Sequence, residues 1–169
     1  MSPYMPRFWW AAIVVVILDQ LTKLLALHFL SDNVVVKVMP FFNFVLAFNK
    51  GAAFSFLADA DGWQHIFFIV IALVVSVAIV IMARRLKPEE MQTALALMLV
   101  LGGAIGNVLD RMRLGYVVDF IDWYYRTWHW PTFNIADAGI ALGAVLLIMD
   151  TVGWRILKSA SADNAANST

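Results

Sequence analysis

Asp119 and Asp137 are the residues of this 169-residue chain whose type and spacing best suit hydrolysis. Two carboxylates that converge at a partly desolvated site differ in proton affinity. One can then act as general base toward a water while the other, protonated, hydrogen-bonds the scissile carbonyl, as in aspartic peptidases. Asp122 is a rival partner because it lies three residues after Asp119. The spacing alone equally fits aspartates that are simply solvated.

Asp137 also has an explanation that requires no chemistry. Asn134 is a favourable N-cap residue for a helix, which would place Asp137 in the first turn. The helix dipole stabilises an acidic side chain at that position. The residues alone leave both interpretations of Asp137 open.

Two further groups of polar residues interrupt apolar stretches, where an ionisable side chain needs a partner or water. Asp19 and Lys23 are four residues apart and share a helix face, which favours an ion pair that tethers the helices. Asn107 and Arg111 have the same spacing and could donate hydrogen bonds to a substrate carbonyl. Alternatively, Arg111 snorkels to the membrane interface and Asn107 bonds to another helix.

Metal-dependent and nucleophilic chemistry find little support in the sequence. The chain has no cysteine, which excludes disulfides, thiol nucleophiles and cysteine metal sites. Its three histidines, His28, His65 and His129, are scattered and lack the spacing of a zinc site. The serines have no histidine at a meaningful distance in sequence. The residues therefore predict no metal site.

The composition indicates that lipid is the main solvent of this protein. Hydrophobic residues make up 62% of the chain, charged residues 14%, and the mean hydropathy is +0.78. A chain with this balance cannot present an ordinary water-soluble surface. The formal net charge is zero, so nucleic acid is not an expected partner. We expect a single membrane-embedded domain over residues 1–169 that contacts membrane lipid.

The elements that must position these residues follow from the apolar stretches. We predict an all-α membrane bundle of four transmembrane helices at about 8–30, 63–83, 93–109 and 135–157. Within the outer segment 31–62, residues 34–48 are rich in β-branched and aromatic types, which predicts a small sheet or hairpin that turns near Pro40. Residues 110–134 mix aromatic and acidic types and predict a short interfacial helix or re-entrant segment. The tail 159–169 is small and polar and is expected to be disordered.

The distribution of basic residues predicts which side of the membrane each segment occupies. Four spans would place both termini on one side, together with the basic loop that contains Arg84, Arg85 and Lys87. The positive-inside rule makes that side cytoplasmic, although further Lys and Arg are spread through the longer opposite segments. The aspartates of 110–134 and the start of the fourth helix would then face outward.

Five sequence blocks, in order and spread over nearly the whole chain, resemble lipoprotein signal peptidase, also called signal peptidase II. These blocks are DQLTK at 19–23, NKGAAFS at 49–55, GGAIGN at 102–107 followed by DR at 110–111, VVDFI at 117–121, and FNIAD at 133–137. The resemblance implies that Asp119 and Asp137 are the catalytic aspartates, and it disfavours Asp122. It further implies that other site residues contact substrate or support the dyad: Asn49, Gly51, Asn107, Arg111, Asn134, Asp19 and Lys23.

The resemblance also implies a substrate and a location. Members of this family remove the signal peptide from diacylglyceryl-modified prolipoproteins on the amino side of the lipidated cysteine. They act at the outer face of the bacterial cytoplasmic membrane, without metal or cofactor, and we expect a monomer.

Two functions of other classes compete with this prediction. A transporter or proton relay would line its path with Asp19, Lys23, Arg111 and Asp137, but the polar residues crowd the outer half of the predicted bundle. A structural scaffold would explain the glycines of 93–109 but not the cluster of asparagines and aspartates. Both are therefore disfavoured.

Overall fold

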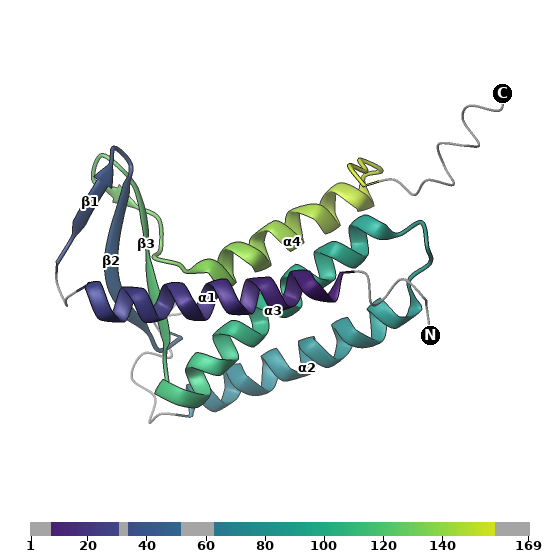
Figure 1. Cartoon of the computed structure of the whole chain (residues 1–169), viewed down its shortest axis with the longest axis horizontal. Helices are drawn as coiled ribbons and strands as arrows, with labels where there is room; N and C mark the ends of the chain where they lie inside the picture. The colour runs from purple at the N-terminus through teal and green to yellow at the C-terminus, as the bar shows by residue number, and fades with distance from the viewer. Residues whose placement is uncertain (1–7, 31–33, 52–62, 158–169) are drawn as a thin grey trace.

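The computed structural model describes residues 8–30, 34–51 and 63–157. The helices are α1 (Trp9–Phe29), α2 (Gln64–Arg85), α3 (Met91–Leu114) and α4 (Ile135–Thr151), and the strands are β1 (Val36–Met39), β2 (Phe42–Asn49), β3 (Val117–Tyr125) and β4 (Trp128–His129). The helices form an elongated bundle, and the strands cross one end of it (Figure 1). The predicted tail 159–169, together with 31–33 and 52–62 of the predicted sheet segment, lies outside the described residues.

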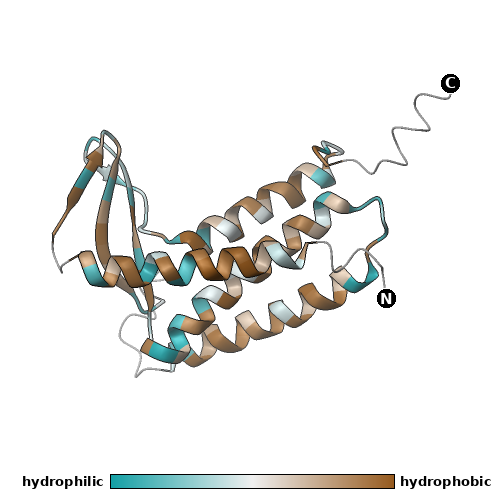
Figure 2. Cartoon of the chain, viewed as in Figure 1, coloured by the Kyte–Doolittle hydropathy of each residue, from teal (hydrophilic) through white to brown (hydrophobic). Residues whose placement is uncertain are grey.

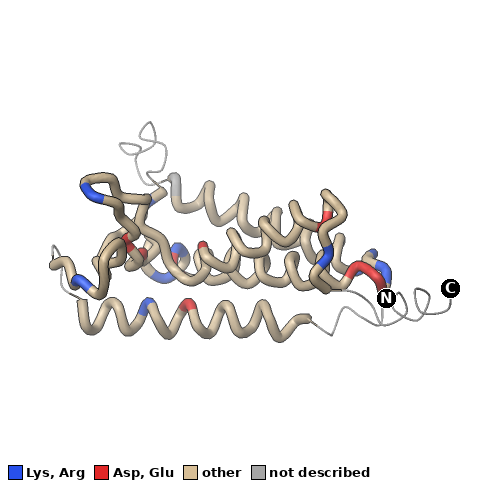
Figure 3. Tube along the Cα trace, turned by 90° about the horizontal axis from the view of Figure 1, so that it is seen from above, with Lys and Arg blue, Asp and Glu red and all other residues tan. Residues whose placement is uncertain are grey.

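Three helices in the described part of the chain are long and apolar enough to cross a membrane. They are Trp9–Phe29 of α1, His65–Arg85 of α2 and Met91–Leu114 of α3. Apolar residues dominate all of them, and hydrophilic residues on α1 and α3 gather toward the sheet (Figure 2). Charged residues lie in the half that carries the sheet and at the opposite end (Figure 3). The protein is therefore an integral membrane protein.

α4 is shorter than the predicted span 135–157. It has 17 residues and ends at Thr151, so it is about 25 Å long, near the lower limit for crossing the hydrocarbon core. The chain then turns, and Gly153 takes a positive φ of 80°. The buried side chain of Gln92 holds this turn, because its amide donates to the carbonyl oxygens of Leu146 and Trp154. The fourth transmembrane span thus stays a prediction.

α3 is the central helix of the bundle, and its small residues permit close packing. It packs against α1, α2 and α4. A Cβ on Gly102 would lie 2.9 Å from the Cα of Ala12 in α1, and a Cβ on Gly143 of α4 would lie 2.6 Å from the carbonyl oxygen of Ala96. Only glycine permits this approach of helix backbones. The interior position predicted for 93–109 is confirmed.

The strands form one end of the molecule in the order β1-β2-β3-β4, with every neighbouring pair antiparallel. β1 and β2 turn at Pro40 and Phe41, which confirms the hairpin predicted near Pro40. The short interfacial helix predicted within 110–134 is wrong for 117–129, because these residues form β3 and β4. α3 continues to Leu114, Gly115 ends it with a φ of 80°, and β3 then pairs with β2. This long-range pairing favours the extended conformation over an amphipathic helix.

Candidate active site

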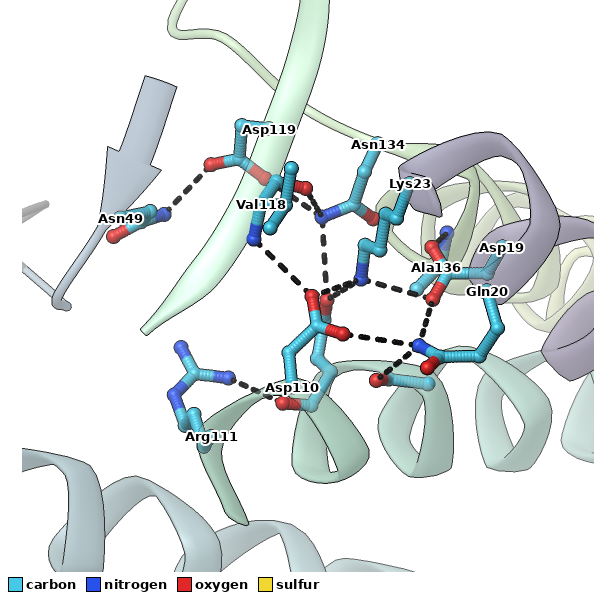
Figure 4. A network of polar contacts seen from close by, with 12 residues as sticks. Asp19, Gln20, Lys23, Asn49, Asp110, Arg111, Val118, Asp119, Asn134 and Ala136 are labelled. Carbon is cyan, nitrogen blue, oxygen red and sulfur yellow. Dashed lines mark hydrogen bonds and ion pairs between the residues drawn. The ribbon is translucent and has the colours of Figure 1, made fainter. Parts of the chain in front are cut away.

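The polar residues singled out from the sequence converge where the sheet meets the helices. The network in Figure 4 draws side chains from α1, α3, β2 and β3 and from the N-terminus of α4. The end of β2 and the start of β3 lie next to the last turns of α3, because Asn49 pairs with Val117 shortly after α3 ends. The fold thereby joins residues that are far apart in the sequence.

Asp119 is almost completely buried at the centre of this region. Its side chain belongs to β3, and the residue is 1% exposed. One carboxylate oxygen accepts a hydrogen bond from Asn134 Nδ2 at 2.6 Å, and the other accepts from Asn49 Nδ2 at 3.0 Å. Burial, followed by repulsion from Asp137, raises the pKa of Asp119 to about 6, although the two amide donors oppose the rise. Asp119 can therefore exchange a proton near neutral pH.

Asp137 lies in the first turn of α4, as the N-cap prediction required. Asn134 Oδ1 accepts from the backbone N–H of Asp137 at 3.0 Å, and Asp137 Oδ2 accepts from the backbone N–H of Asn134 at 3.3 Å. This reciprocal pair is a capping box. The other oxygen of Asp137 accepts from Asn107 Nδ2 at 2.8 Å. The cap explanation is confirmed, but it does not exclude chemistry, because the same Asn134 also contacts Asp119.

Asn107 is oriented by two donors on its oxygen. Its Oδ1 accepts from Lys23 Nζ at 3.1 Å and from Asn134 Nδ2 at 3.2 Å. Since both neighbours can only donate there, the amide nitrogen of Asn107 must point to Asp137. The interaction across helices expected of Asn107 is therefore present, and it ends on a candidate catalytic carboxylate.

Lys23 and Asp19 form the predicted ion pair, with 2.9 Å between Nζ and Oδ2. The structure adds Asp110, whose Oδ2 lies 2.9 Å from the same ammonium. All of these side chains are buried, and a buried charge requires such partners. The sequence predictions do not include Asp110 among the site residues, although it begins the DR pair at 110–111 that carries part of the family resemblance.

The two carboxylates of this cluster also hold the backbone next to both candidate catalytic residues. Asp110 accepts from the N–H of Val118 at 3.1 Å, and Val118 immediately precedes Asp119. Asp19 accepts from the N–H of Ala136 at 2.9 Å, and Ala136 immediately precedes Asp137. Figure 4 shows these contacts on either side of Lys23. The cluster thus ties β3 and α4 to α1 and α3.

Gln20 completes the cluster and was also missed as a site residue. Its Nε2 donates to Asp110 Oδ1 at 3.0 Å and to Asp19 Oδ2 at 3.2 Å. The available signal was its position within DQLTK, where a neutral polar residue accompanies two charged ones in an apolar helix.

Arg111 and Gly51 lie at the edge of the site. Arg111 donates to the backbone oxygen of Asn107 at 3.4 Å and interacts electrostatically with the carboxylates of Asp137 and Asp119. Gly51 has a φ of 94°, and its N–H donates to Asn49 Oδ1 at 2.8 Å. That bond leaves Asn49 Nδ2 free to donate to Asp119. The structure therefore brings together every site residue predicted from the sequence.

Asp122 belongs to a different environment. Residues three apart in a strand point to opposite faces, so Asp122 faces away from Asp119. Its oxygens contact His129 Nδ1 at 2.8 Å and Asn43 Nδ2 at 2.9 Å. Within the described ranges, no group of three or more His, Asp or Glu side chains is arranged to hold a metal ion.

Comparisons with known proteins show which family this chain belongs to. Residues 11–153 match the family described as signal peptidase (SPase) II. A lipoprotein signal peptidase of Coxiella burnetii (strain Dugway 5J108-111) is 49% identical over 140 residues, which are 83% of this chain and 86% of the relative. A second one, of Shewanella amazonensis (strain ATCC BAA-1098 / SB2B), is 46% identical over 160 residues, which are 95% of this chain and 92% of the relative. A solved structure described as a bacterial membrane enzyme superposes with a TM-score of 0.75 at 32% identity and covers 84% of this chain and 90% of that one.

Proposed function

Because this chain belongs to the signal peptidase II family of membrane proteases, which process lipoproteins, we propose that Asp119 and Asp137 form its catalytic dyad. The substrate is a diacylglyceryl-modified prolipoprotein. The bond cleaved lies on the amino side of the lipidated cysteine. The whole chain acts as one membrane-embedded peptidase domain and as a monomer.

The reaction is the addition of water to the scissile amide. The ionised carboxylate of the dyad takes a proton from a water molecule as the water oxygen attacks the carbonyl carbon. The protonated carboxyl donates a hydrogen bond to the carbonyl oxygen. In the tetrahedral intermediate, a proton passes from the dyad to the amide nitrogen. The C–N bond then breaks to give a carboxylic acid and the free amino group of the lipidated cysteine, and the dyad keeps one proton.

The observation that carries this proposal is the connection of Asn134 to both carboxylates. Its side chain binds Asp119 at 2.6 Å, and its backbone N–H binds Asp137 at 3.3 Å. Asn134 thus holds the two carboxylates at a fixed spacing. A water molecule can be positioned between them only if that spacing is fixed. The raised pKa of Asp119, near 6, supports a shared proton.

The remaining site residues have supporting roles in this proposal. Arg111 and the turn that contains Asn49 and Gly51 bind the substrate backbone, and the cluster of Asp19 and Lys23 supports Asn107. The site faces the outer side of the bacterial cytoplasmic membrane, with both termini in the cytoplasm. A site at that depth suits a substrate whose signal helix and acyl chains both lie in the bilayer.

The direct test uses the purified protein in detergent and a peptide that carries a diacylglyceryl-cysteine lipobox. We expect the wild type to cleave before the lipidated cysteine, and Asp119→Asn and Asp137→Asn each to abolish turnover. Asp122→Asn is the matched control and should keep most of the activity, because Asp122 lies on the opposite face of β3. Full turnover by either dyad variant would contradict the proposal.

A further inference from the structure

α2 approaches the candidate site through an aromatic side chain. Within the described residues, the hydrogen bonds around the two aspartates come from α1, α3, α4, β2 and β3. Most of α2 is apolar, and little of its length is buried inside the protein. Phe68 differs from the rest of α2, because it is half-buried and its ring lies against Arg111 and Gly51 of the site.

The first contact of Phe68 is with Arg111. The guanidinium carbon lies 5.1 Å from the ring centroid, within the range of a cation–π interaction. The hydrogen bond of Arg111 to Asn107 is long, at 3.4 Å, so it restrains the guanidinium only weakly. The ring of Phe68 therefore adds to the attraction of the nearby carboxylates in holding the guanidinium beside the dyad.

The second contact of Phe68 is with Gly51. A Cβ on Gly51 would lie 2.8 Å from Phe68 Cδ2 and 3.2 Å from Cζ, and it would overlap Cε2. Only a glycine can bring its backbone so close to the ring, and its positive φ also favours glycine. The N–H of Gly51 orients Asn49, which in turn binds Asp119. The ring thus supports the backbone on which the amide of Asn49 depends.

We propose that Phe68 is a positioning residue of this enzyme, holding Arg111 and the Gly51 turn against the dyad at the same time. It links the contacts of Asp119, which run through Asn49, to those of Asp137, which run through Asn107. It also makes the site depend on how α2 packs. The inference rests on the proposed function, because the placement of Arg111 and Asn49 matters only if the dyad is catalytic.

The first experiment measures cleavage of the same lipobox peptide by Phe68→Leu and Phe67→Leu. Phe67 is the matched control, because it adjoins Phe68 in α2 and is 43% exposed. We expect Phe68→Leu to lower kcat/KM about tenfold and Phe67→Leu to change it less than about twofold. Equal effects of the two substitutions would overturn the proposal.

A second experiment separates the role of the ring from simple packing. Phenylalanines with one, two or three ring fluorines are incorporated at position 68, which weakens the attraction for a cation while nearly preserving shape. We expect kcat/KM to fall stepwise, to about threefold below wild type with three fluorines, while the Tm stays unchanged. An activity independent of fluorine number would overturn the placement of Arg111 by Phe68. Failure of the proposed function would instead appear as an inactive wild type or an active Asp119→Asn.

Discussion

At the residue scale, the candidate site is governed by amide side chains whose two ends make different contacts. Asn134 and Asn49 donate to Asp119, and Asn107 donates to Asp137. Each amide oxygen has its own donor, which prevents the amide from turning over. Such donors favour the ionised carboxylate, whereas burial favours the neutral one. The protonation of Asp119 therefore depends on a balance that a single substitution can shift.

The pH dependence of activity should reveal this balance at Asn49. Loss of the proton shared by the dyad should lower kcat/KM as the pH rises above about 6, the raised pKa of Asp119. Asn49 lowers that pKa by donating to the carboxylate, so Asn49→Ala should raise it. We expect the alkaline limb of the pH profile, where kcat/KM falls, to move to a higher pH by up to about one unit.

The measurement is kcat/KM against pH, with Asn43→Ala as the control. Asn43 bonds to Asp122 and not to Asp119, so its substitution should leave the limb in place. A downward movement in Asn49→Ala would contradict the assigned role of this amide.

At the element scale, a buried cluster of charges holds the segments that carry the aspartates. Lys23 of α1 pairs with Asp19 and with Asp110 of α3, and these two carboxylates accept backbone N–H groups of β3 and α4. The contacts hold the backbone of β3 and of α4 next to the candidate catalytic residue that each one carries. The arrangement depends on one ammonium shared by two carboxylates.

Removal of that ammonium should be costly. Lys23→Met keeps most of the apolar stem of the side chain but leaves two buried carboxylates without the ammonium that they share, which costs about 3–5 kcal/mol. We expect a lower Tm in detergent and little remaining cleavage. In the double variant Lys23→Met/Asp110→Asn, one unpaired charge is gone, so part of the Tm should return while activity stays low. Lys37→Met, at an exposed position of β1, should match the wild type in both measurements.

Close packing of α3 against α4 gives a second prediction at this scale. Gly143→Val places carbon atoms where Ala96 O and Val100 Cγ2 lie within 2.6 and 2.7 Å of the added Cβ. The helices would have to separate, at a cost of about 1–3 kcal/mol. Thermal unfolding in detergent should show a lower Tm, whereas Ala141→Val, at an exposed position of α4, should leave the Tm unchanged. An unchanged Tm in Gly143→Val would show that this contact is not tight.

At the scale of the whole molecule, the sheet and the α2–α3 connection lie at opposite ends of the bundle (Figure 1). The candidate site is at the sheet end, where α1 and α3 carry the polar network. In the proposed orientation, this end faces outward and the basic end of α2 faces the cytoplasm.

The absence of native cysteine allows a direct test of this orientation. Single cysteines are introduced as Arg126→Cys in the β3–β4 turn and Glu89→Cys between α2 and α3. A thiol reagent that cannot cross the cytoplasmic membrane should label Arg126→Cys in intact cells and Glu89→Cys only after permeabilisation. Labelling in the reverse order would contradict the proposed topology.

Local patterns of the sequence determined the helices of the bundle, the turn near Pro40 and the cap at Asn134, because each depends on residues close together in the chain. Tertiary structure decided that 117–125 pair as a strand, that Asp122 faces away from Asp119, that Asp110 pairs with Lys23, and that the ring of Phe68 lies against Arg111. These features arise from contacts between segments far apart in the sequence. The favourable free energy of those contacts outweighs the local conformational preference of the residues. Family resemblance selected Asp119 and Asp137, and only the fold explains why Asn134 connects them.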